Sequence, residues 1–215
     1  MSEDKEDGLI ETMRSKGNLT SDRVEEAIRS APRHLFVPGK VKDKAYVDSP
    51  LSIGHGQTIS QPSVVAKMTE FLDVEEGDRI LEIGTGSGWQ SAVLSHLVGG
   101  KGKVYTVEVF ESLAEQARKN LKEAGAENVE VVVGDGSTGL EEHAPYDGII
   151  CTAVSPEVQD DWVDQLRVGG RIVSPVSGTV LHDLVVVEKT SEGEAEVVEK
   201  ERGYRFVKLK GEKGF

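Results

Sequence analysis

Apolar residues recur at helical spacing in the first third of the chain. They do so within 9–13 and again within 24–28, where the Thr-Ser-Asp run at 20–22 supplies candidates for the helix cap. A third amphipathic helix is expected to begin at Pro62. Residues 45–62 carry two prolines and two glycines and predict a long ordered loop, and loops of that length usually serve function.

From residue 79 onward, short apolar runs alternate with stretches of helical periodicity. This alternation predicts an α/β fold in which parallel strands form a doubly wound sheet. Two strand patterns around a Ser-Glu-Gly turn then predict an antiparallel hairpin at the C-terminal edge, giving a Rossmann-like, mostly parallel sheet of about seven strands. The predicted strands are 79–83, 103–108, 128–133, 146–151, 171–176, 181–189 and 194–204, and the predicted helices are 89–98, 113–124 and the segment with Val158, Trp162 and Leu166 before Gly169-Gly170.

The chain is expected to form one compact unit with two parts. Residues 1–76 should supply N-terminal helices and a loop packed on the core, and residues 77–215 should form the Rossmann-like domain. A chain of 215 residues is long enough to bury such a core.

Composition and charge narrow the class of protein. With 25 Lys and Arg against 38 Asp and Glu, the net charge is −13, which argues against a non-specific nucleic-acid binder. No run approaches the roughly 18 apolar residues of a membrane helix, and the acidic start MSEDKEDG does not resemble a signal peptide. The single cysteine, Cys151, fits a reducing compartment. We therefore expect a cytoplasmic monomer without nucleic-acid or membrane partners.

The strongest chemical signal is the sequence LEIGTGSGW at 81–89. A strand ends there, three glycines alternate, and a helix begins, so that free N–H groups can face a ligand. A dinucleotide fingerprint, G-x-G-x-x-G, would need its third glycine where Trp89 stands. The observed pattern is G-x-G-x-G, with Glu82 two positions before the first glycine.

Two further polar positions follow the next predicted strands. Glu108 ends the strand 103–108, where a carboxylate can accept hydrogen bonds from both hydroxyls of a ribose. Asp135 and Gly136 follow the strand 128–133. Each alone is typical of a solvated turn. Together with the glycine loop they lie at the carboxyl ends of successive strands, where open α/β sheets place their ligands.

The glycine variant resembles the motif of class I, Rossmann-like S-adenosylmethionine-dependent methyltransferases. The segments 24–38 and 45–62, with the distinctive stretch GQTISQP, closely resemble the protein-L-isoaspartate (D-aspartate) O-methyltransferase family. The resemblance covers roughly residues 20–215 in register. Further matching segments are 146–158, 169–176 and 203–209.

This resemblance implies a role for individual residues. Ser60 would be the catalytic serine, as a hydrogen-bonding positioner and not as a covalent nucleophile, and the residues near Val207 and Lys210 would close over the site. No metal ion is expected. The substrate would contact Ile53, His55, Arg205 and Val207. S-adenosylmethionine, and its product S-adenosylhomocysteine, would be held by Gln57, Thr58, Ile59, Ser60, Glu82, Gly84, Gly86, Ser87, Gly88, Glu108, Asp135 and Gly136.

The implied chemistry agrees with the residue types present. The family methylates the free carboxylate of L-isoaspartyl or D-aspartyl residues in damaged proteins and peptides, and a carboxylate with a pKa near 4 is already ionised at neutral pH. The methyl donor is a sulfonium, so catalysis requires placement and desolvation and no strong base. The resulting ester would collapse to a succinimide and reopen partly as normal aspartate, which is repair.

Three alternatives remain at this point. The first is another S-adenosylmethionine-dependent methyltransferase acting on RNA, DNA or a small molecule, although the D/N-P-P-Y/F motif of nitrogen methylation is replaced by Cys-Thr-Ala-Val at 151–154. The second is a non-enzymatic module that kept the fold. The third is a nicotinamide-dependent dehydrogenase, which the missing third glycine disfavours.

Overall fold

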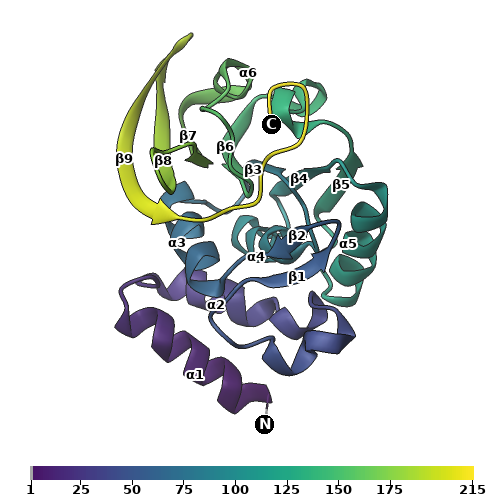
Figure 1. Cartoon of the computed structure of the whole chain (residues 1–215). Helices are drawn as coiled ribbons and strands as arrows, with labels where there is room; N and C mark the ends of the chain where they lie inside the picture. Colours follow the sequence, from purple (N-terminus) through teal and green to yellow (C-terminus); the bar gives the residue numbers. More distant parts are fainter. Residues whose placement is uncertain (1) are drawn as a thin grey trace.

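A computed structural model describes residues 2–215 and shows one seven-stranded sheet with helices on both faces (Figure 1). The strand order is β5-β4-β3-β6-β7-β8-β9, in which β3 to β7 run parallel and the last two strands pair antiparallel. The predicted Rossmann-like α/β fold is confirmed. The strands are β3 (Arg79–Ile83), β4 (Lys103–Glu108), β5 (Val129–Val133), β6 (Tyr146–Cys151), β7 (Leu166–Val176), β8 (His182–Ser191) and β9 (Glu194–Tyr204).

The long helices lie where the apolar periodicity predicts them. Ser21 caps the second helix, because its side chain accepts a hydrogen bond from the backbone N–H of Val24. The α-helices are α1 (Ser2–Ser15), α2 (Asp22–Ser30), α3 (Pro62–Leu72), α4 (Trp89–Val98), α5 (Glu111–Glu123) and α6 (Asp160–Asp164), and short 3₁₀ turns span Arg33–Leu35, Gly39–Lys44, Gly136–Thr138 and Glu141–His143.

Alternate residues of the central strands bury their side chains on opposite faces of the sheet. Ile80 and Ile150 pack in one hydrophobic cluster with side chains of α1 to α4. Their neighbours Leu81 and Ile149 pack in a second cluster, which includes Trp162 of α6. Because both faces are covered, these strands read as nearly continuous apolar runs in the sequence.

The N-terminal helices share a core with the sheet. α2 packs against α3 and α4, and α1 packs against α3, as seen at the base of Figure 1. Leu9 and Met13 belong to the same hydrophobic cluster as Val173 of β7. The division into residues 1–76 and 77–215 stays a prediction. Among the residues described, no helix combines the length and the apolar character needed to cross a membrane.

The prediction of one long ordered loop over 45–62 is wrong in its centre, which contains two strands. β1 (Leu51–Gly54) and β2 (Gln57–Ile59) form an antiparallel hairpin that turns at His55 and Gly56, whose φ angles are 51° and 70°. These strands are only four and three residues long. So short a run cannot establish a period-two pattern, and the proline and glycine content therefore dominated the prediction.

The predicted helix through Val158, Trp162 and Leu166 is also wrong at its end. α6 covers only Asp160–Asp164, and Leu166 already pairs with Tyr146 in the sheet. β7 then continues through the two glycines after an irregularity in its pairing with β6. Trp162 and Leu166 are both buried, so apolar spacing alone did not separate one helical turn from the start of a strand.

Candidate active site

The glycine loop leaves β3 at the point where the strand order reverses. β3 lies between β4 and β6, which makes the carboxyl ends of these strands the expected place for a ligand. Gly84 has a φ of 93°, and a Cβ there would lie 2.6 Å from Oγ1 of Thr152, which donates a hydrogen bond to the Gly84 carbonyl. Only glycine fits this backbone, so the loop presents its main chain directly to the crevice.

Glu108 joins the end of β4 to the glycine loop. Its Oε2 accepts a hydrogen bond from the backbone N–H of Gly86 at 2.8 Å, and its Oε1 accepts one from the N–H of Phe110 at 3.1 Å. The side chain is only 5% exposed, and burial raises the pKa of Glu108 in spite of these hydrogen bonds. Each oxygen keeps a second lone pair, so the carboxylate can still accept from a ligand.

Asp135, after β5, holds the C-terminal segment in place. Its Oδ1 accepts from the backbone N–H of Ser137 at 2.9 Å, and its Oδ2 accepts from that of Glu212 at 2.7 Å. Partial burial raises the pKa of Asp135, but these hydrogen bonds outweigh it and the net pKa is lowered. The close approach of the C-terminal segment requires glycine at position 211, because a Cβ on Gly211 would lie 1.9 Å from Oδ1 of Asp135 and collide with it.

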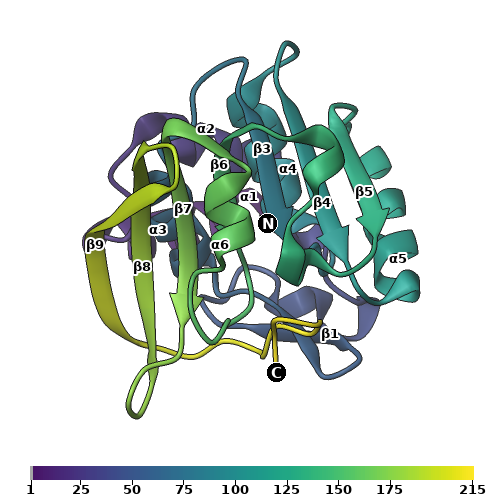
Figure 2. The same cartoon turned by 90° about the horizontal axis from the view of Figure 1, so that it is seen from above.

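The C-terminal segment crosses the carboxyl ends of the strands. Figures 1 and 2 show it running from β9 past the ends of β6 and β3. It is anchored by two backbone hydrogen bonds, from the N–H of Val154 to the carbonyl of Val207 at 2.8 Å and from the N–H of Leu209 to the carbonyl of Val154 at 2.9 Å. The segment therefore lies across the crevice, and the closing of the residues near Val207 and Lys210 over a bound ligand stays a prediction.

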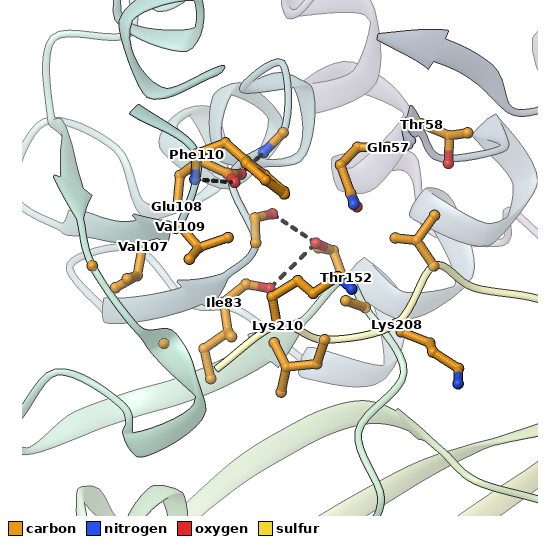
Figure 3. A pocket seen from close by; sticks show the side chains of 17 residues that line it. Gln57, Thr58, Ile83, Val107, Glu108, Val109, Phe110, Thr152, Lys208 and Lys210 are labelled. Carbon is orange, nitrogen blue, oxygen red and sulfur yellow. Dashed lines mark hydrogen bonds between the residues drawn. The ribbon is translucent and has the colours of Figure 1, made fainter. Parts of the chain in front are cut away.

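A first cavity lies between the glycine loop, the end of β4 and the C-terminal segment. In Figure 3, Gln57 and Glu108 reach toward this cavity from opposite sides, with Thr152 between them. Six of the twelve predicted cofactor residues line it, and their role in binding stays a prediction. The lining residues are Gln57, Thr58, Ile83, Gly84, Gly86, Val107, Glu108, Val109, Phe110, Gly134, Gly136, Thr152, Ala153, Val207, Lys208, Leu209 and Lys210.

A second cavity, of about 480 Å³, adjoins the first. It contains Ser60 and is bordered by the end of β9 and the start of α3. Thr58, Thr152 and Val207 line both cavities and form the boundary between them. The other lining residues are Asn18, Pro50, Gln61, Ser63, Val64, Gly203, Tyr204, Arg205 and Phe206.

Two predicted cofactor residues are buried at the glycine loop, Glu82 at the end of β3 and Ser87 within the loop. Glu82 is fully buried, its Oε2 accepts a hydrogen bond from Ser91, and burial raises the pKa of Glu82 to about 8. Within the described residues, Oε1 of Glu82 and Oγ of Ser87 have no hydrogen-bond partner. Both residues line a narrow space that also reaches Ser60. Unpaired buried oxygens here fit a ligand that brings polar hydrogens.

Ile53 and His55, predicted to contact substrate, lie on the side of the first cavity. A Cβ on Gly86 would lie 3.3 Å from Cδ1 of Ile53. The His55 ring stacks on Phe110 at 4.8 Å between centroids, and its Nε2 lies 2.8 Å from Oγ of Ser112. Their substrate-binding role stays a prediction. Arg205 and Val207, by contrast, line the second cavity beside Ser60.

Several lining residues escaped the sequence analysis. Thr152 follows directly on β6, so the rule that ligands bind at strand ends was a sufficient signal for it. Phe110 follows Glu108 by two positions and carries no motif of its own. Asn18 reaches the second cavity from the turn between α1 and α2, a contact that only the tertiary fold creates.

The matching family model and the two curated relatives described here all point to the same family. The family model described as protein-L-isoaspartate(D-aspartate) O-methyltransferase matches residues 4–214. A protein-L-isoaspartate O-methyltransferase of Archaeoglobus fulgidus is 50% identical, over 99% of this chain and 96% of its own length. One from Methanopyrus kandleri is 48% identical, over 96% of this chain and 92% of its own.

Solved structures agree with these relatives. A protein-L-isoaspartate O-methyltransferase structure superposes with a TM-score of 0.84 at 32% identity, covering 97% of this chain and 67% of the other. A beta-aspartate methyltransferase from Plasmodium falciparum, in complex with S-adenosyl-L-homocysteine, also gives a TM-score of 0.84, covering 95% of this chain and 98% of the other. Its 22% identity makes it support for the fold alone.

Proposed function

The chain belongs to the protein-L-isoaspartate(D-aspartate) O-methyltransferase family, and from this membership we propose how its two cavities divide the reaction between them. The first cavity holds S-adenosylmethionine, and the second holds the damaged peptide. The observation that carries this proposal is the shared boundary of Thr58, Thr152 and Val207, across which the methyl group passes.

The protein is a carboxyl O-methyltransferase that repairs proteins. It transfers the methyl group of S-adenosylmethionine to the free carboxylate of L-isoaspartyl residues. The family's description extends this activity to D-aspartyl residues. This family assignment replaces the three alternative hypotheses, which were a methyltransferase of RNA, DNA or a small molecule, a non-enzymatic module, and a dehydrogenase.

The residues around the first cavity fit the methyl donor. Glu108 offers carboxylate lone pairs where ribose hydroxyls can bind, and the backbone of Gly84 and Gly86 can approach the ligand closely. In the narrow space that also reaches Ser60, the unpaired hydroxyl of Ser87 can bind a polar group of its methionine part. When bound, S-adenosylmethionine supplies a methyl group on a sulfonium sulfur, which is already activated for transfer.

The residues around the second cavity need only to bind and orient a carboxylate. The substrate carboxylate is ionised at neutral pH, so no side chain has to remove a proton. We assign to Ser60 the hydrogen bond that fixes this carboxylate, because Ser60 lies in the second cavity next to the shared boundary. Arg205, at the rim, offers a positive charge to the anionic substrate.

We further propose that the enzyme acts as a monomer in the cytoplasm, with isoaspartyl proteins and peptides as its partners and without nucleic acid or membrane. The net charge of −13 disfavours nucleic acid. The single, buried Cys151 suits a reducing compartment.

A substitution in one cavity should change the Michaelis constant of one substrate only, either the peptide or S-adenosylmethionine. Arg205→Ala is expected to raise KM for an isoaspartyl peptide about fivefold, since an exposed charge contributes roughly 1 kcal/mol. Phe110→Ala is expected to raise KM for S-adenosylmethionine by about fivefold, because the Phe110 ring lines the first cavity and its contact with the ligand is lost. Steady-state kinetics with each substrate varied in turn measures both effects.

Matched controls are the exposed residues Arg202→Ala and His96→Ala, which lie outside both cavities. They should leave both constants within about twofold of the wild type. The proposed division of the site fails if Arg205→Ala raises KM for the methyl donor or if Phe110→Ala raises KM for the peptide.

A further inference from the structure

Arg33 is a buried cation that the mechanism above does not use. Its side chain is 1% exposed, in the 3₁₀ turn that follows α2. Burial lowers the pKa of the guanidinium to about 10, so it stays protonated at neutral pH. A buried charge costs several kcal/mol unless hydrogen bonds compensate for it. The partners of Arg33 therefore indicate what the charge is for.

These partners are backbone carbonyls of two separate segments. Nη1 donates to the carbonyl of Ala45 at 2.6 Å, and Nη2 donates to those of Ser49 and Ser60, both at 3.0 Å. Residues 45–50 form no helix or strand, so their carbonyls depend on such donors. One planar group thus ties this irregular segment to the main chain of the proposed catalytic serine.

The face of the same guanidinium contacts the start of α4. Its central carbon lies 5.1 Å from the centroid of the Trp89 ring, and Trp89 Nε1 donates to the carbonyl of Ala31 at 2.8 Å. Trp89 is the first residue after the glycine loop. Arg33 therefore lies between the segment that carries Ser60 and the helix that fixes the cofactor loop.

Asp48 fixes the residues that follow Ser60. Its Oδ1 accepts from the backbone N–H of Ser63 at 2.9 Å, and its Oδ2 accepts from Nε2 of Gln61 at 3.1 Å. Arg33 thus binds the carbonyl of Ser60, and Asp48 binds the polar groups of Gln61 and Ser63 just after it. The position of the serine is set by charged groups that do not themselves line the second cavity.

We infer that Arg33 is a positioning residue for methyl transfer, which fixes Ser60 against the glycine-loop helix and so sets the place of the substrate carboxylate. The inference rests on the proposed role of Ser60. Placement errors of about 1 Å can cost on the order of 100-fold in rate. A lysine keeps the charge but lacks the planar fork that spans Ala45, Ser49 and Ser60.

The test compares Arg33→Lys and Arg33→Met with the wild type. Both should lower kcat, by about tenfold for lysine and by 30-fold or more for methionine, while the equilibrium Kd for S-adenosylmethionine stays within about threefold. Hydrogen exchange should rise in residues 45–50 and 60–63 and stay unchanged in β3. Met13→Ala is the control, because Met13 is fully buried in α1 and should lower thermal stability without changing kcat.

A double variant distinguishes positioning from a general loss of structure. If Arg33 acts through Ser60, then Arg33→Lys combined with Ser60→Ala should be no more than about threefold slower than Ser60→Ala alone. Multiplication of the two losses would overturn the inference, and so would an unchanged kcat in both single variants. A wild-type enzyme that fails to methylate an isoaspartyl peptide would instead overturn the proposed function, which these ratios do not test.

Discussion

Glu108→Gln is expected to raise the Kd for S-adenosylmethionine about 100-fold. The carboxylate already accepts from the N–H groups of Gly86 and Phe110, and we propose that its remaining lone pairs accept from two ribose hydroxyls. In glutamine an NH2 group replaces one of the two carboxylate oxygens, so a donor would face the donor N–H of Gly86 or Phe110. Losing two hydrogen bonds to a charged group costs about 3 kcal/mol, which corresponds to the stated factor.

Equilibrium binding of S-adenosylmethionine measures this effect without requiring turnover. Glu115→Gln is the matched control, because Glu115 is an exposed residue of the neighbouring helix α5. It should bind the ligand like the wild type. If Glu108→Gln binds S-adenosylmethionine within about threefold of the wild type, then Glu108 does not hold the ribose and the first cavity is wrongly assigned.

Ser60→Ala is expected to lower kcat by about 10-fold to 100-fold and to leave the Kd for S-adenosylmethionine within about twofold. The variant removes one hydrogen bond to an ionised carboxylate, for which 1.5–3 kcal/mol is typical. The backbone of Ser60 keeps its contact with Arg33. Single-turnover kinetics of methyl transfer to an isoaspartyl peptide measures the effect on the chemical step.

Ser52→Ala controls for the loss of a hydroxyl from the hairpin that precedes Ser60, since Ser52 is exposed on β1 and its removal should leave the rate unchanged. An unchanged rate in Ser60→Ala would remove the serine from the reaction. A large loss of cofactor affinity with an unchanged rate constant would place Ser60 in the cofactor site and not beside the substrate.

The sequence was sufficient for the sheet and for the glycine loop because both depend on local pattern. The central strands are buried on both faces, so each appears as a continuous apolar run between clear breaks, and 79–83, 103–108 and 146–151 are predicted at the observed bounds. Once parallel order is known, Gly84, Glu108 and Gly136 must meet at one edge of the sheet. The first cavity brings these three residues together.

The sequence was insufficient wherever a contact joins distant segments. Nothing near Arg33 indicates that its side chain would reach Ser60, because 27 positions and two strands separate them. The hydrogen bond from the N–H of Glu212 to Asp135 spans 77 positions. Such contacts depend on how the loops cross after the sheet has formed, and apolar periodicity carries no information about that.

The central claim is that this enzyme methylates the free carboxylate of an isoaspartyl residue at the boundary of the two cavities. The most direct measurement supplies the purified protein with S-adenosylmethionine and a pair of peptides that differ only in an isoaspartyl or a normal aspartyl linkage, and determines the methanol released from methyl esters. The isoaspartyl peptide should be methylated and the aspartyl peptide should not. Equal methylation of both peptides, or of neither, would contradict the account.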